Sequence, residues 1–372
     1  MARTVLITGG AGFIGSHLAD ELLEAGDTVK AYDSLAPQVH GPDAQRPDYL
    51  DDDVELIVGD VRDERRLQRA LDGVDVVVHF AAAVGVGQSM YEVARYTDVN
   101  AVGTATLLDL IARRPVEKLL VASSMSIYGE GMYRTADGDL VPGPERSLAQ
   151  LKSGIWDLLD GEGRTLTPVP TPEEKTCTLP SVYALTKYDT ERLALLVGRA
   201  YDVPTVALRF FNAYGPRQAL SNPYTGVLAI FGARLLNNRA PLINEDGRQR
   251  RDFVSVHDVA RACRLALETN AADGLALNVA SGRSFTVSEV AERLATVLGR
   301  SRIMPEITGN YRVGDIRHCF GDISRARRLL GFEPQVSFEA GLEELADWLD
   351  RQAAEDRVEA ARAELYARGL AI

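Results

Sequence analysis

Continuous runs of apolar residues alternate along the chain with segments in which apolar residues recur every three or four positions. The continuous runs predict buried strands, and the periodic segments predict helices. Expected strands lie at Val5–Ile7, Thr28–Tyr32, Val54–Val58, Val74–Phe80, Leu119–Ala122, Val206–Phe211 and Ala276–Val279, and clear helices at Ala101–Arg113 and Tyr183–Tyr201. Strands that alternate with helices in this way indicate an α/β fold with a Rossmann-type, doubly wound parallel sheet.

Two regions interrupt this alternation. Residues 131–181 are rich in Gly, Pro, Thr and Glu, and we expect an insert there with a short helix near Trp156. Residues 213–252 and 281–349 hold mixed short elements, which we expect to form a smaller, interleaved substrate-binding cap. The sheet domain then comprises 1–212 and 253–280, and the charged, Ala-rich residues 350–372 predict a solvated helical tail.

The first predicted strand ends in a glycine turn, Thr8-Gly9-Gly10-Ala11-Gly12-Phe13-Ile14-Gly15, and a helical pattern follows. The N–H groups of such a turn and the dipole of its helix can hold a pyrophosphate. Asp33, eighteen residues after Gly15, is placed to accept hydrogen bonds from a ribose and to repel a 2′-phosphate, which favours NAD over NADP. Asp60 follows another strand, where it could bind the adenine, form a turn or cap a helix.

A tyrosine and a lysine lie one turn apart on the predicted helix at 183–201. Tyr183 and Lys187 therefore project from the same face. A lysine charge, together with a bound nicotinamide cation, is expected to lower the pKa of the tyrosine toward neutrality, as a general base requires. Ser124 and Ser126 follow the strand at Leu119–Ala122 and place hydroxyl groups at the same edge of the sheet.

Composition and charge exclude several classes of protein. The 372 residues are 46% hydrophobic, which is ordinary globular usage, and 41 basic against 53 acidic residues give a net charge of −12. Such an acidic chain repels nucleic acid and anionic membranes. Its three scattered cysteines lack the spacing of a metal site or a disulfide framework. The apolar runs are too short for a signal peptide or a span, so we expect a cytoplasmic protein.

Together these motifs resemble the extended short-chain dehydrogenase/reductase family, specifically its nucleotide-sugar epimerase and dehydratase group. The same resemblance extends to the stretches at Arg209–Arg217, Arg251–Val259, Arg312–Asp315 and Leu330–Pro334, so that it covers about residues 4–349 in the order of the family. It implies that Tyr183 is the acid/base, that Lys187 binds the nicotinamide ribose and tunes Tyr183, and that Ser124 hydrogen-bonds the reacting sugar hydroxyl.

The resemblance also implies contacts with NAD and with a nucleoside-diphosphate sugar. Asn100 matches an asparagine that supports the catalytic helix and the site. The cofactor set is Gly9, Gly12, Phe13, Ile14, Gly15, Asp33, Asp60, Val61, Phe80, Ala81, Ala82, Asn100, Tyr183, Lys187 and Phe210, and the substrate set is Ser124, Ser126, Asn212, Arg217, Arg251 and Arg312. Guanidinium groups suit a diphosphate, although each arginine could instead form an ion pair with a neighbour such as Asp252 or Asp315.

The residues after Ser124 separate the chemistries of the group. Dehydratases of the family carry an acid there, and a uronate decarboxylase is expected to show a Glu, whereas this chain has Met125 and Ser126. The remaining reaction is 4-epimerisation: oxidation of a sugar hydroxyl, rotation of the keto-sugar and return of the hydride, with the cofactor bound throughout. A 4-keto-sugar reductase and an NAD-sensing module without catalysis are the alternatives.

The insert is similar to that of a bacterial subgroup described as dTDP-L-rhamnose 4-epimerases. The similarity lies in residues 168–175, 218–226 and 313–318. Many members have paired cysteines in the insert, but this chain has only Cys177 there, so no metal is predicted and a UDP-hexose or UDP-uronate remains an alternative substrate. The family also implies a homodimer through helices 101–113 and 183–201. His79, His257 and His318 are interpreted as hydrogen-bonded structural residues.

Overall fold

The computed structural model of the chain describes residues 2–220, 222, 224, 226–312, 314–352 and 356–371. Ser221, Pro223, Thr225 and Val313 belong to the stretches that carry the resemblance, and they lie outside the described residues. Residues 1, 353–355 and 372 of the expected domains and tail do so as well.

Seven parallel strands form the central sheet, in the order β14-β9-β5-β4-β1-β2-β3. The strands are β1 (Thr4–Thr8), β2 (Thr28–Asp33), β3 (Glu55–Val58), β4 (Val76–His79), β5 (Lys118–Ser124), β9 (Thr205–Phe210) and β14 (Ala276–Val279). The order reverses at β1, because β2 pairs with one of its edges and β4 with the other. Such a reversal opens a crevice at the carboxyl ends of the strands. The predicted doubly wound sheet is confirmed.

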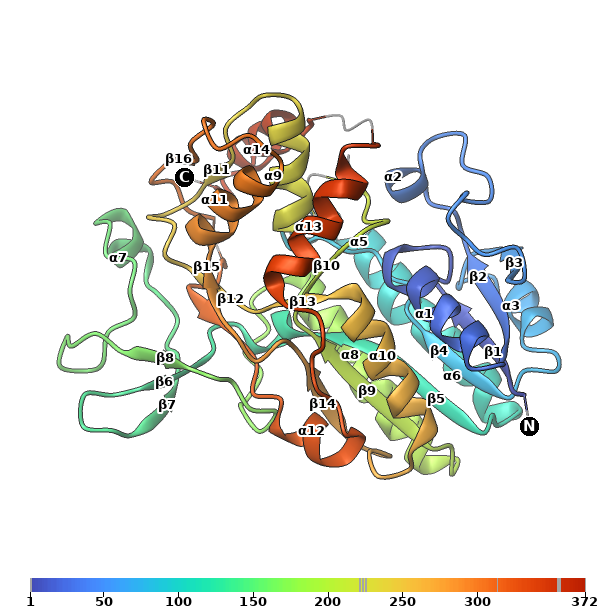
Figure 1. Cartoon of the computed structure of the whole chain (residues 1–372). Coiled ribbons are helices and arrows are strands. Elements are labelled where there is room, and N and C mark those ends of the chain that lie inside the picture. Colours follow the sequence, from blue (N-terminus) through green and yellow to red (C-terminus); the bar gives the residue numbers. More distant parts are fainter. Residues whose placement is uncertain are drawn as a thin grey trace.

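Helices cover both faces of this sheet (Figure 1). One layer holds α1 (Phe13–Glu24), α10 (Val256–Glu268) and α12 (Ser324–Leu330), and the other holds α3 (Glu64–Ala70), α6 (Gly103–Arg113) and α8 (Val182–Ala200). Successive strand residues face opposite layers, so that Ile7 packs with Leu18 in one core and Leu6 packs with Leu107 in the other. Burial on both faces explains why the strands are continuous apolar runs.

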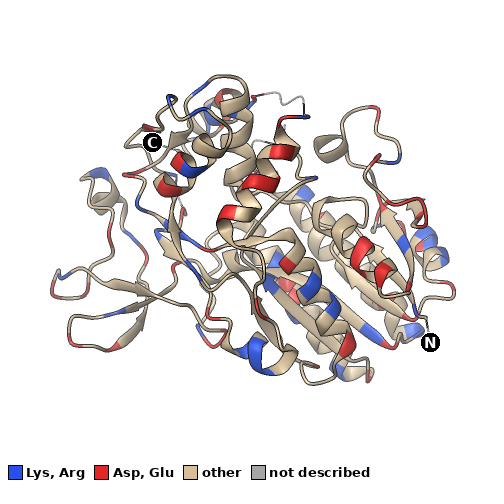
Figure 2. Cartoon of the chain, viewed as in Figure 1, with Lys and Arg blue, Asp and Glu red and all other residues tan. Residues whose placement is uncertain are grey.

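A smaller unit lies beyond the carboxyl edge of the sheet. Its helices are α9 (Val227–Leu236), α11 (Val287–Val297) and α13 (Phe338–Leu349), and they share a core that includes Phe231, Leu294 and Phe338. Its short strands are β10 (Asn212–Tyr214), β11 (Leu242–Ile243), β12 (Arg250–Arg251), β13 (Phe253–Ser255), β15 (Phe285–Thr286), β16 (Glu306–Ile307) and β17 (His318–Cys319). Figure 2 shows acidic and basic residues interspersed over many elements, with several acids on α13.

The insert projects from the body and contains a small antiparallel sheet (Figure 1). Its strands are β6 (Met132–Arg134), β7 (Leu140–Pro142) and β8 (Thr167–Val169), and its helix α7 (Leu148–Lys152) lies just before Trp156. The sequence did not predict this sheet, because Pro142 and Pro168 argue against strands. Both prolines lie on edge strands that flank β6, which is where proline is tolerated.

Short helical segments complete the chain. They are α2 (Pro37–His40), α4 (Val86–Ser89), α5 (Val93–Tyr96), η1 (Thr97–Val102) and η2 (Met125–Tyr128), and the tail forms α14 (Val358–Ala367). The expectation that this tail is solvated is wrong for one face of α14, because Ala361 and Leu365 are buried and Leu365 packs beside Gly87. None of the helices in the described part of the chain has the length and apolar character that crossing a membrane requires.

Candidate active site

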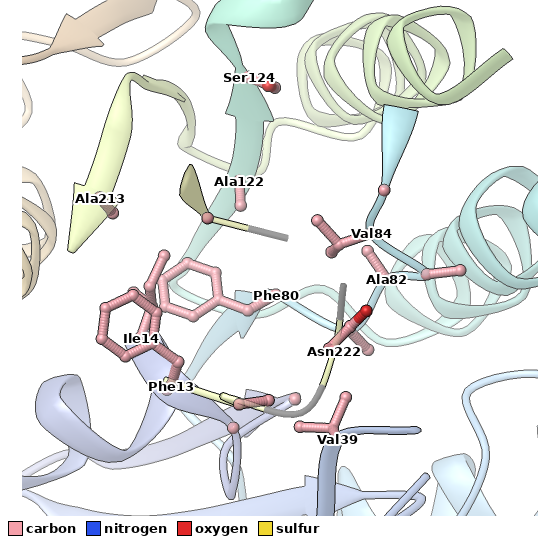
Figure 3. Close-up of a pocket in the computed structure, with 18 of the residues that line it drawn as sticks. Phe13, Ile14, Val39, Phe80, Ala82, Val84, Ala122, Ser124, Ala213 and Asn222 are labelled. Atoms are coloured by element: carbon pink, nitrogen blue, oxygen red, sulfur yellow. The ribbon is translucent and has the colours of Figure 1, made fainter. Parts of the chain in front are cut away.

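A cavity of about 580 Å³ lies in the crevice above β1 (Figure 3). Its walls come from the glycine turn, the ends of β2, β4 and β5, the start of α8 and the cap. The fold brings most of the predicted site residues to this cavity: Gly9, Gly12, Phe13, Ile14, Gly15, Asp33, Asp60, Val61, Phe80, Ala81, Ala82, Ser124, Ser126, Tyr183, Lys187, Phe210 and Asn212.

The glycine turn has no space for side chains. Gly9 has φ +72°, and a Cβ there would lie 2.9 Å from the nitrogen of Ala81. A Cβ on Gly15 would lie 2.3 Å from the carbonyl oxygen of Gly9. None of the described side chains caps the start of α1, so the N–H groups of its first turn are available to a ligand in the cavity. This cradle fits the pyrophosphate of a dinucleotide.

Asp33 is held firmly at the end of β2. Its carboxylate accepts hydrogen bonds from the N–H groups of Ala11 (3.1 Å) and Leu35 (2.9 Å), which fixes it beside the glycine turn. The sequence did not predict that His40 also lies here, with its Nε2 3.7 Å from Asp33 Oδ1. Burial lowers the pKa of His40, although the charge of Asp33 opposes this. A neutral His40 offers no positive charge for a 2′-phosphate.

Asp60 forms a turn beside the cavity. Its carboxylate accepts hydrogen bonds from the backbone N–H and the Nε of Arg62, both at 2.9 Å. The hydrogen bond from the Arg62 side chain is the main reason why the pKa of Asp60 is lowered. Asp63, and not Asp60, caps α3, because its side chain accepts from the N–H of Arg66. The helix-capping alternative for Asp60 is therefore wrong.

The three predicted catalytic residues meet at one end of the cavity. Ser124 ends β5, and its Oγ accepts hydrogen bonds from the N–H (3.2 Å) and the hydroxyl (2.9 Å) of Ser126. Tyr183 and Lys187 lie on the first turns of α8, which Ser181 caps by accepting from the N–H of Ala184. Ser124 also acts on the Tyr183 side chain, whose pKa it tends to lower.

Burial dominates the protonation of this group. It raises the pKa of Tyr183 to about 12, against the hydrogen bond from Ser124, and it lowers the pKa of Lys187 to about 8, against the charge of Glu191. The expected lowering of the Tyr183 pKa is therefore not a property of the chain alone. Desolvation favours the neutral phenol, and a cationic nicotinamide ring is the additional positive charge that would favour the phenolate.

Asn100 acts through other groups, because it does not line the cavity. Its side chain accepts from the N–H of Ala83 (2.7 Å), and it donates to the carbonyl of Ala83 and to Thr186 Oγ1, both at 3.0 Å. It lies in η1, a short π-helical segment, a geometry that is frequent at functional sites. Asn100 ties the end of β4 to α8 next to Lys187, so its prediction as a cofactor contact is corrected to that of a positioning residue.

The predicted substrate arginines lie outside the cavity lining. Arg217 pairs with Asp20 at 2.7 Å. Arg251 donates to the carbonyls of Arg250 and Arg317 and lies 3.7 Å from Asp315, while Arg312 pairs with Asp315 at 3.1 Å. The ion-pair alternative with Asp315 is therefore observed. Asp252 instead accepts from Ser281 and Gly282.

The three histidines are held by hydrogen bonds. His79 lies between Thr8 Oγ1 (2.7 Å) and Thr104 Oγ1 (3.0 Å), and burial lowers its pKa to about 3. His257 lies 2.8 Å from Glu344, and His318 accepts from the N–H of Arg250 at 3.0 Å. Within the described residues, no group of three or more His, Cys, Asp or Glu side chains is arranged to hold a metal ion.

Sequence reasoning missed two features of the wall. Val39, Val84 and Val86 line the cavity although each is more than a third exposed, which is unusual for large apolar side chains that serve no ligand. Asn212 Oδ1 and Gln218 Oε1 are buried in the lining without a hydrogen-bond partner in the structure. Val84 and Val86 flank Gly85 directly after the alanine run, and this adjacency to a predicted cofactor segment was the available signal; Val39, in α2, had no such signal.

A glycine cradle and a Ser–Tyr–Lys group that line one cavity are the arrangement expected of an enzyme that uses a nicotinamide dinucleotide. Residues 5–148 match the model of the NAD dependent epimerase/dehydratase family, and residues 163–345 match that of GDP-mannose 4,6 dehydratase. The dTDP-L-rhamnose 4-epimerase of Burkholderia thailandensis is 35% identical over 94% of this chain and 96% of its own length.

Solved structures of two epimerases share the whole fold. The UDP-glucose 4-epimerase of Thermotoga maritima, solved with UDP-glucose, has a TM-score of 0.76 and 30% identity over 94% of this chain and 99% of its own. A variant of the UDP-glucuronic acid 4-epimerase of Bacillus cereus, solved with a UDP-sugar and NAD, has a TM-score of 0.76, 26% identity and the same coverage.

The chain therefore belongs to the NAD-dependent epimerase/dehydratase family, within the extended short-chain dehydrogenases/reductases. It is an NAD-dependent sugar epimerase-type enzyme, and the predicted family and cofactor are confirmed.

Proposed function

We propose that the chain is a nucleotide-sugar 4-epimerase that acts on a dTDP-6-deoxyhexose such as dTDP-L-rhamnose. The observation that carries the reaction type is the Ser124, Tyr183 and Lys187 group, beside which Met125 and Ser126 stand in place of an acid. The 35% identity to a dTDP-L-rhamnose 4-epimerase supports the choice of sugar.

Each residue of the group has a distinct task. Tyr183 Oη accepts the proton of the sugar C4 hydroxyl as that carbon is oxidised and returns it when the carbon is reduced. Ser124 hydrogen-bonds the same oxygen and holds it beside the phenol. Lys187, one turn along α8, keeps a positive charge near Tyr183 and favours the phenolate. NAD supplies the hydride acceptor and, after rotation of the keto-sugar, the hydride donor.

Elimination of water would need one more proton donor. A 4,6-dehydratase must protonate the leaving hydroxyl at C6, and neither the thioether of Met125 nor the hydroxyl of Ser126 is an acid of suitable strength. Met125 is buried and lines the cavity beside Ser124. The keto-sugar therefore has one productive outcome, which is reduction from its opposite face.

Apolar residues of the cavity wall suit a methyl group at C5 of the sugar. Val84, Val86 and Met125 present apolar surface to the cavity. A uronate would instead need a free cation, but each described arginine of the lining is paired, Arg62 with Asp60 and Asp98 and Arg95 with Glu92. This pattern favours a neutral 6-deoxyhexose over a UDP-uronate.

Arg251 and Arg312 are our candidates for the substrate diphosphate. Both guanidinium groups meet Asp315, so two positive charges share one carboxylate. Burial alone would raise the pKa of Asp315, but Arg312, Arg251 and Arg146 outweigh it, and the pKa lies below its ordinary value. Asn212, with its unpartnered Oδ1 at the cavity, is the candidate that links this pair to the catalytic residues.

A panel of dTDP- and UDP-sugars, followed by NMR of the products, tests this proposal because C4 epimers differ in their coupling constants. We expect interconversion of dTDP-L-rhamnose and its C4 epimer without added NADH. Stoichiometric consumption of NADH would indicate the 4-keto-sugar reductase instead. Tyr183→Phe should lose activity by about a thousandfold, with Tyr188→Phe on the same helix as a control. Unchanged turnover of Tyr183→Phe would favour the non-catalytic NAD-sensing module.

We also propose that two copies pair through α6 and α8. These helices pack against each other, and Val102 at the start of α6 and Leu185 and Leu196 on α8 are each more than 40% exposed. Apolar residues on adjoining helices fit a second copy of the same surface. Analytical ultracentrifugation should show a dimer, and Leu185→Glu should shift it to monomer. A monomeric wild-type protein at micromolar concentration would contradict the proposal.

A further inference from the structure

We infer that a cluster of two side-chain amides and one guanidinium across the mouth of the cavity retains the cofactor between turnovers. The cluster, here called the amide latch, consists of Gln38, Gln88 and Arg95. Its value to the enzyme rests on the proposed epimerisation, in which the same NAD accepts and returns the hydride and must not leave in between.

The latch spans the crevice where the strand order reverses. Gln38 lies in α2, which follows β2, and Gln88 lies in α4, which follows β4. Since β2 and β4 flank β1, a bond between these helices passes over the glycine turn at the end of β1. Gln38 and Arg95 themselves line the cavity. The sequence gives no sign of this contact, because fifty positions separate the two glutamines.

The two amides bond to each other reciprocally. Gln38 Nε2 donates to Gln88 Oε1 at 2.8 Å, and Gln88 Nε2 donates to Gln38 Oε1 at 3.4 Å. Arg95 adds a third bond, from its Nη2 to Gln38 Oε1 at 3.0 Å. The latch therefore joins α2 to both helices on the opposite side of the crevice.

On the side of α4 and α5, further hydrogen bonds hold Gln88 in place. Gln88 is buried, and it also accepts from the hydroxyl of Tyr96 (3.1 Å) and donates to Glu92 (2.9 Å). On the α2 side, Gln38 also donates to Asn222 at 3.2 Å. Figure 3 shows Val39 and Asn222 on the side of the cavity opposite Phe13 and Ile14. A dinucleotide bound at the glycine turn would lie between these two sides, and on this proposal its release would require the latch to open.

The rate of NAD release tests the latch without any sugar substrate. Protein loaded with NAD is mixed with excess alcohol dehydrogenase and ethanol, which convert released NAD to NADH, and the absorbance of NADH is followed. Gln38→Ala removes four hydrogen bonds, two with Gln88, one from Arg95 and one to Asn222, and should release NAD at least about tenfold faster. Gln88→Ala should have a similar effect from the other side, and it keeps the test open if Gln38→Ala folds poorly.

The double variant identifies the bond itself. If Gln38 and Gln88 act through each other, the double variant should release NAD no faster than the more affected single variant. Gln68→Ala, on the exposed face of α3, is the matched control and should release NAD at the wild-type rate. Release from both single variants within twofold of wild type, or effects that multiply in the double variant, would overturn the latch. Either result leaves the epimerase assignment intact, because the NMR panel decides it separately.

Discussion

Two buried polar networks stabilise this enzyme, one made of neutral groups and the other of charged groups. Below the catalytic residues, neutral side chains form a series of hydrogen bonds, here called the neutral relay. Thr8 bonds to His79, His79 to Thr104, and Thr104 to Thr190 at 3.2 Å, with Asn100 beside them. Where the insert meets the cap, the network is ionic. The Arg317 side chain is fully buried and bonds to Asp157, Glu245 and Asp246 at 2.6 to 2.9 Å.

The difference follows from what each network must support. A fixed charge below the site would act on Tyr183 and Lys187 through a medium of low dielectric and change their protonation. Neutral hydrogen bonds position α8 without that effect. Glu191, the acid one turn after Lys187, is the charged exception: it is paired in a bidentate manner with Arg209 at 2.6 and 2.9 Å, and its charge still acts to raise the pKa of Lys187. At the junction no proton is transferred, so buried charges are tolerated provided that they are compensated.

Removal of the central cation should show the largest effect. Arg317→Met removes the cation that Asp157 and Asp246 share and one of the two partners of Glu245, which keeps Arg146 at 2.8 Å. We expect a loss of about 3–5 kcal/mol in the free energy of unfolding. Urea denaturation measures this. Arg164→Met is the matched control, because Arg164 pairs with two carboxylates as well, Asp137 and Asp160 of the insert, but on the surface. Equal losses for the two variants would contradict the distinction between a buried and an exposed ion network.

A charge introduced into the neutral relay is the reverse experiment. Asn100→Asp keeps the shape of the side chain but buries a carboxylate at a position that is 1% exposed, and we expect a loss of about 3 kcal/mol at neutral pH. Asn100→Ala should lose less. Burial would raise the pKa of the new carboxyl, so the loss in Asn100→Asp should grow as the pH rises above 4. A loss that does not change with pH would show that the relay accepts a charge.

The relay also predicts a response to acid. The pKa of His79 in the folded chain is about 3, below the ordinary value near 6.5, so the unfolded chain binds more protons between these pH values. Stability from this residue is therefore complete above pH 6.5 and decreases as the pH falls, by about 2 kcal/mol at pH 5. His79→Gln should cost less at pH 5 than at pH 7.5 by this amount. The same cost at both values would contradict a buried neutral imidazole.

The sequence predicts the residues at the active site, but it does not predict the partners of Arg317. The glycine turn, Tyr183 with Lys187, and Ser124 could be predicted because each lies in a local pattern of strand, turn or helix that fixes its direction. Arg317 and its partners are 71 to 160 positions apart, and His40 reaches Asp33 only through the path of α2. Such contacts depend on how distant loops pack, and no periodicity along the chain records them. The family resemblance places Arg251 and Arg312 in the substrate set, and the structure shows both beside Asp315, which is the ion-pair alternative.

A third contact, at the surface, should show the smallest loss in the free energy of unfolding. Arg368, which follows α14, stacks on the ring of Tyr91 with 4.5 Å between its guanidinium carbon and the ring centroid. Because this cation–π contact is exposed to water, Arg368→Ala should lower the free energy of unfolding by only about 0.5–1 kcal/mol. Tyr91 lies three residues from Gln88, so the same variant should change NAD release by less than twofold if the latch stands on its own bonds. A larger acceleration would show that the tail supports the latch, and that the expectation of a solvated tail missed a functional contact.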